Sequence, residues 1–198
     1  MDYSLMRKGF NLKKILKLFI VLIVIVAILI VIFANKNTIM KMFYIIKYSE
    51  YVEKYSKEYD VDKYLIYACI KAESNFNEKA ESKKGAKGLM QLMDSTGQEI
   101  AKGLNMTIDN DDLFEPEINI KLGTKYVSKM LQKYENTELA LAAYNAGSGN
   151  VDSWINSGKI KADGSDAENI PFKETNNYVR KILKDYRIYK ELYEKANN

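Results

Sequence analysis

Glu73 is the residue of this sequence best placed for acid–base chemistry. It lies four residues after Cys69 and three before Phe76, so a helix over residues 61–74 would put its carboxyl on or beside a buried stripe. Burial and the negative end of the helix dipole both disfavour the anion, so we expect a raised pKa and a general acid protonated near neutral pH. The alternative is an exposed glutamate at a fraying helix end.

The composition leaves few other sources of chemistry. The 198-residue chain has no histidine and one cysteine, Cys69. This excludes histidine-dependent nucleophiles and histidine metal sites, and also an internal disulfide or a cysteine-ligated cluster. Residues 109–112 faintly resemble a calcium loop, but the glutamate expected at loop position twelve is missing. We therefore expect neither a metal nor a cofactor.

The elements that must position Glu73 are expected to be helices separated by short polar turns, which makes the fold class all-α. Asp60 can cap the helix over residues 61–74, and Pro116 can open another. The helices expected after these residues are 61–74, 89–102, 116–134, 138–146, 150–156 and 174–196. The polar stretch 157–170 is expected to be a mobile loop.

Five tyrosines precede this region at positions 44, 48, 51, 55 and 59, a spacing that places them on one face of a helix. We favour an aromatic face that packs on the domain. A sugar-stacking or interfacial strip is the alternative.

The N-terminal part of the sequence predicts a membrane-spanning helix. Residues 18–34 are all apolar, and residues 15–34 just reach the ~20 residues that a helix needs to cross a bilayer. Five basic residues and one acidic residue precede residue 18, which predicts a cytoplasmic N-terminus. A cleaved signal peptide is the alternative, but Ile32-Phe33-Ala34 is a poor cleavage site.

The remaining charge is balanced, with 25 basic and 25 acidic residues from position 18 onward. The net charge of +4 therefore belongs to the N-terminal tail. The sequence gives no reason to expect nucleic-acid binding.

Several motifs together closely resemble the soluble lytic transglycosylase (SLT) domain, which has a goose-type-lysozyme-like fold. The resemblance covers about residues 50–195, with the motifs in the family's order and spacing. The motifs are AESNF at 72–76, GAKGLMQLM at 85–93, DLFEPEINI at 112–120, AYNAG at 143–147 and IPFKET at 170–175. Asp94 stands where the family often has proline, and we interpret this change as structural because aspartate suits the first turn of a helix.

The resemblance implies roles for individual residues. Glu73 matches the catalytic acid/base, and Tyr144 matches a tyrosine whose hydroxyl bonds that carboxyl. Ser82 and Gln91 match polar groups that hold substrate sugars or their N-acetyl arms. The other matches are the apolar cleft walls Met90 and Met93, the positions Asn145 and Glu174 that line or brace the cleft, and Tyr178, for which packing and glycan contact are equally open.

The implied activity is a lytic transglycosylase that cleaves the MurNAc–GlcNAc β-1,4 bond of peptidoglycan and leaves 1,6-anhydro-MurNAc ends. Most glycosidases pair two carboxylates, whereas the resemblance supplies one. A lysozyme-like muramidase that hydrolyses the same bond is one alternative. A non-catalytic peptidoglycan-binding module is another.

The sequence thus predicts a cytoplasmic basic tail (1–14), a transmembrane helix (15–34), a juxtamembrane helical linker (35–49) and the catalytic domain (50–198). The expected location is the cell membrane, with a single span and an extracellular catalytic domain, or secretion if the segment is cleaved. Expected partners are peptidoglycan glycan strands and the cytoplasmic membrane. Cell-wall, secretion or conjugation machinery is a further candidate partner.

Overall fold

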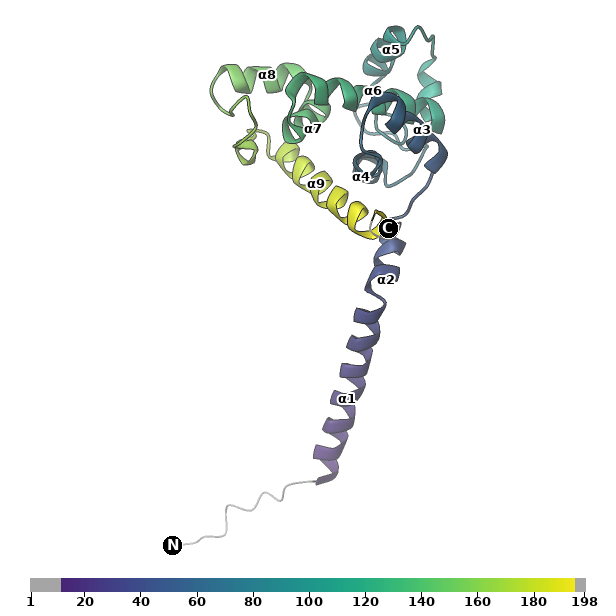
Figure 1. Ribbon diagram of the computed structural model, residues 1–198, viewed down its shortest axis with the longest axis vertical. Coiled ribbons are helices and arrows are strands. Elements are labelled where there is room, and N and C mark those ends of the chain that lie inside the picture. The colour runs from purple at the N-terminus through teal and green to yellow at the C-terminus, as the bar shows by residue number, and fades with distance from the viewer. Residues whose placement is uncertain (1–11, 195–198) are drawn as a thin grey trace. The chain divides into compact units, whose positions relative to one another are not determined.

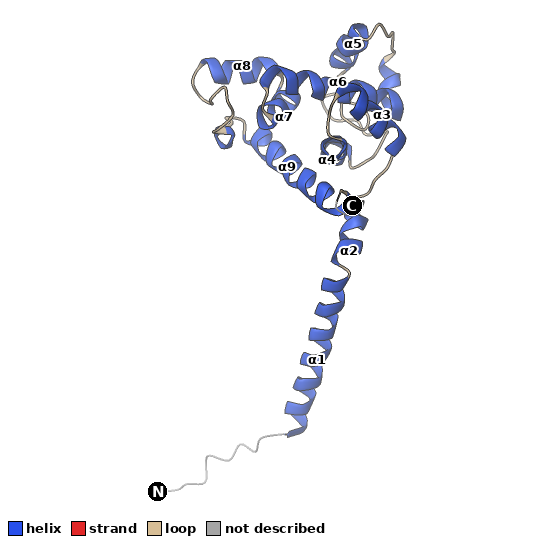
Figure 2. Cartoon of the chain, in the orientation of Figure 1, coloured by secondary structure: helices blue, strands red, loops and turns tan. Residues whose placement is uncertain are grey.

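The computed structural model describes residues 12–194, and these residues form helices, turns and two isolated β-bridges but no strand (Figures 1 and 2). The all-α prediction is confirmed for this part of the chain. In chain order the elements are α1 (Leu12–Ala34), α2 (Lys36–Phe43), α3 (Ser49–Tyr59), α4 (Lys63–Ser74), α5 (Asp94–Gly103), η1 (Asn110–Phe114), α6 (Pro116–Tyr134), α7 (Thr137–Ala146), α8 (Ser148–Asn156), η2 (Ala167–Asn169) and α9 (Lys173–Tyr193).

The chain divides into two compact units between Phe43 and Tyr44. The first unit holds α1 and α2. Within α1, the segment Lys13–Ala34 is long and apolar enough to cross a membrane, with a mean hydropathy of 3.6. Its large apolar side chains are exposed, as expected of a helix that meets lipid rather than a protein core.

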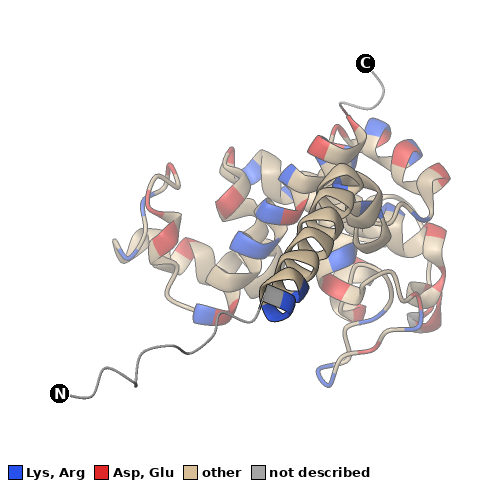
Figure 3. Ribbon diagram, turned by 90° about the horizontal axis from the view of Figure 1, so that it is seen from below, with Lys and Arg blue, Asp and Glu red and all other residues tan. Residues whose placement is uncertain are grey.

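The second unit is built around α4. Every residue of α4 from Tyr64 to Ile70 is buried, so this helix is enclosed on all sides. Helix α4 packs against α9 and α3, α3 packs against α6, and α7 packs against α6, α8 and α9. Basic and acidic residues are interspersed over the helices of this unit (Figure 3).

The start of α4 differs from the prediction in its cap. Asp62, rather than Asp60, is the N-cap, and its side chain accepts a hydrogen bond of 2.8 Å from the Tyr64 amide. Asp60 instead ends α3 in a left-handed conformation with φ 53°. Asp60 is therefore two residues too early to cap the helix that carries Glu73.

The tyrosine stripe does not lie on one helix, so that prediction was wrong. Tyr48 has φ 56° and α3 begins at Ser49, which leaves Tyr44 and Tyr48 outside the helix. Tyr55 and Tyr59 do lie together on α3, buried and stacked with ring centroids 6.0 Å apart. The packing interpretation holds for this pair.

Tyr44 is instead held by the C-terminal helix. Its hydroxyl donates to Asp185 Oδ1 at 2.8 Å, and the Tyr193 hydroxyl donates to its backbone carbonyl at 2.7 Å. The Tyr189 hydroxyl donates to the carbonyl of Ile45 at 3.0 Å. Tyr44 and Ile45 are thus held by side chains of α9 within the second unit.

The helix expected over 89–102 begins only at Asp94. Gly88 has φ +74° and Gln91 has φ +49°, both outside helical geometry. Lys87 and Leu92 instead exchange backbone hydrogen bonds of 2.9 and 3.0 Å, which close a tight loop.

The later helices agree with prediction to within two residues at each end as far as Tyr193, and positions 195–196 of the last one lie outside the described residues. Residues 157–170 form turns and the short helix η2, and their mobility stays a prediction.

Candidate active site

Glu73 lies in the last turn of α4 at a cleft of about 590 Å³. The cleft is also lined by the loop between α4 and α5, by the C-terminal half of α7, by Asn150 of α8 and by the start of α9. Its lining residues are Glu73, Ser82, Lys83, Lys84, Ala86, Gln91, Met93, Tyr144, Asn145, Ala146, Asn150, Phe172, Glu174 and Thr175. The Glu73 carboxyl therefore lines a cleft whose volume is typical of ligand sites, while its own side chain is half-buried.

The Glu73 carboxyl has a raised pKa, as the sequence predicted. Burial raises the pKa from 4.5 to about 7, against a hydrogen bond from Tyr178 and the positive charge of Lys181, both of which lower it. Because the pKa lies near neutral pH, Glu73 can both donate and accept a proton under physiological conditions.

The tyrosine that bonds Glu73 is Tyr178, not Tyr144. The Tyr178 hydroxyl, on α9, donates to Glu73 Oε1 at 2.6 Å. The Tyr144 hydroxyl donates to the backbone carbonyl of Met90 at 2.7 Å. The expected Glu73–Tyr144 bond was therefore wrong, because the close packing of α4 against α9 brings Tyr178 to the carboxyl.

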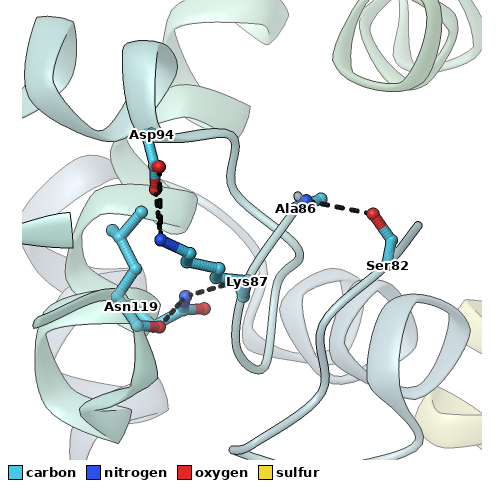
Figure 4. Close-up of polar contacts among 6 residues, drawn as sticks. Ser82, Ala86, Lys87, Asp94 and Asn119 are labelled. Carbon is cyan, nitrogen blue, oxygen red and sulfur yellow. Dashed lines mark hydrogen bonds and ion pairs between the residues drawn. The ribbon is translucent and has the colours of Figure 1, made fainter. Parts of the chain in front are cut away.

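Ser82 and Gln91 shape one wall of the cleft. The Ser82 hydroxyl accepts hydrogen bonds from the amides of Ala86 (3.0 Å) and Lys84 (3.3 Å), so it also braces its own turn (Figure 4). The Gln91 side-chain amide donates to the carbonyls of Ala80 and Gly88, both at 3.0 Å. These bonds use the Gln91 nitrogen and leave its side-chain oxygen as the acceptor that a substrate amide would need.

Asn119 joins this loop to α6, a role that the sequence motif did not reveal. The fully buried Asn119 side chain accepts from the Met90 amide at 2.7 Å and donates to the carbonyls of Lys87 (3.0 Å) and Leu113 (2.7 Å). A Cβ added at Gly88 would collide with Leu113 and Asn119, so glycine is required there by close approach as well as by its positive φ. Two of the three hydrogen bonds of Asn119 are thus made to the loop that carries Gln91, and the third is made to η1.

An ion pair closes the same loop. Lys87 Nζ lies 3.0 Å from Asp94 Oδ1, and the Lys87 side chain is mostly covered (Figure 4). Asp94 is the first residue of α5, which agrees with the structural interpretation of its departure from the family pattern.

Met90 and Met93, which were both expected to form apolar walls of the cleft, lie in different environments. Met93 is 42% exposed and lines the cleft. Met90 is fully buried, and a Cβ added at Gly123 would collide with its sulfur, so its side chain packs against α6. The expected role of Met90 as a cleft wall was wrong, because the left-handed turn at Gln91 directs the side chains of this loop differently from a helix. Met90 acts through its backbone, which bonds Tyr144 and Asn119.

The opposite wall joins α7 to α9. Asn145 Oδ1 accepts a hydrogen bond of 2.8 Å from the hydroxyl of Thr175, and both residues line the cleft. Glu174 lies beside them, exposed, in the first turn of α9. The motif residues of α7 and α9, 30 positions apart in the sequence, thus form one surface.

The residues of this cleft include several that the sequence analysis did not assign: Lys83, Lys84, Ala86, Ala146, Asn150, Phe172 and Thr175. Thr175 and Phe172 belong to the quoted IPFKET motif, so their place in the motif was the available signal.

Within the described part of the chain, no group of three or more histidine, cysteine, aspartate or glutamate residues could hold a metal ion. The Asp109–Asp112 segment forms a capping box at η1, in which the Asp109 amide donates to Asp112 Oδ2 at 2.8 Å. That local pattern accounts for Asp109 and Asp112.

A helical domain built on an enclosed central helix, with one half-buried acid at a cleft, is characteristic of the lysozyme-like class of glycan-cleaving domains. The family model described as "Transglycosylase SLT domain" matches residues 50–166. The chain belongs to this family.

Relatives and solved structures agree with the assignment. The chain is 35% identical to the soluble lytic murein transglycosylase of Salmonella typhimurium over 140 residues, which are 69% of this chain and 22% of the relative. It is 38% identical to the membrane-bound lytic murein transglycosylase C of Edwardsiella ictaluri over 116 residues, 53% of this chain and 32% of that one. The structure of the 70-kDa soluble lytic transglycosylase of Escherichia coli matches with a TM-score of 0.70 and 29% identity, over 76% of this chain and 25% of that one.

The chain spans about a quarter of the length of the curated soluble relatives that it matches. The likeness therefore concerns the SLT domain of longer proteins.

Proposed function

We propose that this protein is a membrane-anchored peptidoglycan lytic transglycosylase that cleaves the MurNAc–GlcNAc β-1,4 bond and forms 1,6-anhydro-MurNAc ends. The observation that carries the proposal is the Glu73 carboxyl, half-buried at the cleft, bonded by Tyr178 and with its pKa raised to about 7. Membership of the SLT family supplies the substrate class.

Glu73 serves as both acid and base in the proposed reaction. In its protonated form it gives its proton to the glycosidic oxygen, and the bond from that oxygen to the muramic C1 breaks. The muramic N-acetyl group stabilises the positive charge that develops at C1. The Glu73 carboxylate then takes the proton of the muramic C6 hydroxyl while the oxygen of that hydroxyl forms a bond to C1. This step closes the 1,6-anhydro ring and returns Glu73 to its acid form.

This route consumes no water, because the attacking hydroxyl belongs to the substrate. An intramolecular nucleophile has a high effective concentration and can outcompete solvent. Ser82, Gln91, Met93, Asn145 and Glu174 are the proposed glycan contacts of the cleft, and Tyr178 is proposed to position the carboxyl.

The hydrolase alternative rests on one observation, which is that Glu174 supplies a second carboxylate to the same cleft. Glu174 is exposed in the first turn of α9, whereas Glu73 is half-buried in the last turn of α4. The end group of the muramic product, 1,6-anhydro or reducing, distinguishes the two activities.

The test is mass spectrometry of purified peptidoglycan after digestion by the full-length protein in detergent, with Glu73→Gln as the control. We expect 1,6-anhydro ends with the parent protein and none with the variant. Reducing muramic ends would establish hydrolysis instead, and Glu174→Gln would then identify the second acid. Cleavage by neither protein, with binding retained, would identify a glycan-binding module.

The proposed organisation is a cytoplasmic tail (1–14), a span (15–34), a linker (35–49) and an extracellular catalytic domain (50–198). The apolar segment Lys13–Ala34 and the membrane-bound relative support anchoring. Its topology can be tested with Lys8→Cys and Lys102→Cys variants and a membrane-impermeant maleimide on intact cells. Only Lys102→Cys should react, and the native Cys69 is buried and gives little background. Retention of the membrane segment in the mature protein would exclude signal cleavage.

An enzyme held at the membrane would act on nearby glycan strands. Local wall opening for growth, secretion or DNA transfer fits this position, and partnership with the corresponding machinery stays a prediction.

A further inference from the structure

Phe172 is the only exposed aromatic residue among the described residues from Tyr44 onward. It is 48% exposed, whereas the other aromatic side chains of this unit are buried or half-buried. A phenyl ring in contact with water loses the favourable burial that aromatic residues usually gain. Its exposure therefore points to a partner that covers the ring.

The Phe172 ring is supported from behind. The Trp154 ring of α8 meets it in an edge-to-face contact, with centroids 4.9 Å apart and planes at 78°. Trp154 itself is 4% exposed and so belongs to the core. The Phe172 carbonyl also accepts a hydrogen bond of 2.9 Å from the Asn176 amide, which fixes its backbone at the start of α9. The ring is thus presented in a fixed position at little further entropic cost.

Phe172 lines the same cleft as Glu73. The other exposed large apolar residues described in this unit are Met93, which also lines the cleft, and Ile46, which does not. The exposed apolar surface of the unit is therefore concentrated beside the proposed catalytic acid rather than spread over the domain.

The side chains around Phe172 are of the kinds that bind a sugar ring. A β-linked pyranose has a face of axial C–H groups that can lie against an aromatic ring, while its equatorial hydroxyl and N-acetyl groups hydrogen-bond at the edge. Near Phe172 the cleft offers the polar groups of Asn145 and Glu174 for such bonds. An apolar platform with polar groups around it is typical of carbohydrate sites.

We propose that Phe172, braced by Trp154, is a stacking platform that binds one N-acetylhexosamine ring of the glycan in this cleft. The inference rests on the proposed function for the identity of the glycan. It adds a specific binding residue that does not take part in proton transfer.

The test is isothermal titration of the full-length protein in detergent with chitotetraose, a β-1,4-linked N-acetylglucosamine oligomer. The Glu73→Gln background prevents turnover. Phe172→Tyr keeps the ring and should bind as the parent does. Phe172→Leu keeps apolar bulk without the ring and should bind about tenfold more weakly. Ile46→Ala, an exposed apolar residue outside the cleft, is the matched control and should have no effect.

Trp154 gives an independent readout of where the sugar lies, because it is the only tryptophan of the chain. Its fluorescence should change on addition of chitotetraose to the Glu73→Gln protein, and the change should persist with Phe172→Tyr. Thermal unfolding followed by the same signal checks that each variant is folded.

Equal affinity of the parent and Phe172→Leu would overturn the proposal, and so would a lack of measurable binding by both. Failure of the proposed function has a different signature, because the parent would then leave no 1,6-anhydro ends on peptidoglycan. Binding that depends on Phe172 would still support the platform in that case. Normal cleavage with no dependence on Phe172 would remove the platform alone.

Discussion

The Tyr178 hydroxyl donates a 2.6 Å hydrogen bond to Glu73 Oε1 across 105 positions of sequence, from α9 to the last turn of α4. This bond lowers the pKa of the Glu73 carboxyl, whereas burial raises it. The resulting pKa of about 7 is a balance between the two helices. The proposed acid/base is therefore tuned by the C-terminal helix as well as by its own.

Removal of the Tyr178 hydroxyl should move the pH profile. Tyr178→Phe deletes an interaction that lowers the pKa of Glu73, so the alkaline limb of kcat/KM should shift to higher pH. Tyr144→Phe is the matched control. It deprives the Met90 carbonyl of its partner, which should cost about 1 kcal/mol of stability and leave the limb in place. A limb that moves equally in both variants would contradict the assignment.

Glu73→Gln should abolish cleavage, with a loss of about 10²–10⁴-fold or more in kcat, because proton donation and abstraction both pass through this group. The amide oxygen can still accept the Tyr178 hydrogen bond, so the fold should be retained. The measurement is release of soluble products from peptidoglycan. Substantial residual activity would mean that another acid carries the reaction.

The same substitution should stabilise the protein in a pH-dependent way. Because the folded pKa is raised from 4.5 to about 7, folding favours the protonated form, and the stability that this gives is fully present below pH 4.5 and is lost as the pH rises through 7. The loss amounts to roughly 3 kcal/mol. The gain in Tm of Glu73→Gln over the parent should thus be small at pH 4 and largest near pH 8. A gain independent of pH would contradict the raised pKa.

Asn119 should be a strong determinant of stability. Asn119→Leu leaves the Met90 amide and the carbonyls of Lys87 and Leu113 without their side-chain partner, and we expect a loss of about 3 kcal/mol. Asn150, whose amide bonds the Ala146 carbonyl at an exposed position, provides the control. Asn150→Leu should cost less than about 1 kcal/mol in the same thermal unfolding measurement. Similar losses in both would mean that the loop does not depend on Asn119.

Position 94 should accept the proline that the family often carries. Asp94 is the first residue of α5, where proline fits the backbone and no helical amide bond is lost. Both Asp94→Pro and Asp94→Ala lose the ion pair with Lys87. Asp94→Pro should retain more stability than Asp94→Ala, because proline suits the first position of a helix. The difference should be below about 1 kcal/mol, because both variants lose the ion pair and only the effect of proline on the unfolded chain separates them. A large loss of stability in Asp94→Pro alone would show that the backbone at position 94 does not accept proline.

The sequence by itself determined the helical class, the apolar N-terminal segment, the family and the candidate acid. These features depend on local periodicity, on composition and on motifs in a fixed order, all of which are visible in one dimension. The helix over Pro116–Tyr134 was predicted to the residue, since a proline opens it and its apolar spacing is regular. The raised pKa of Glu73 followed from its place near a buried stripe.

Only the tertiary structure decided which side chains meet. That Tyr178 rather than Tyr144 bonds Glu73 depends on the packing of α4 against α9, which no local pattern encodes. The burial of Met90 and the late start of α5 follow from left-handed residues at Gly88 and Gln91, which override the helical periodicity of that segment. The exposure of Phe172 above a buried Trp154 likewise arises only when α8 and α9 come together, because exposure is a property of what neighbours leave uncovered.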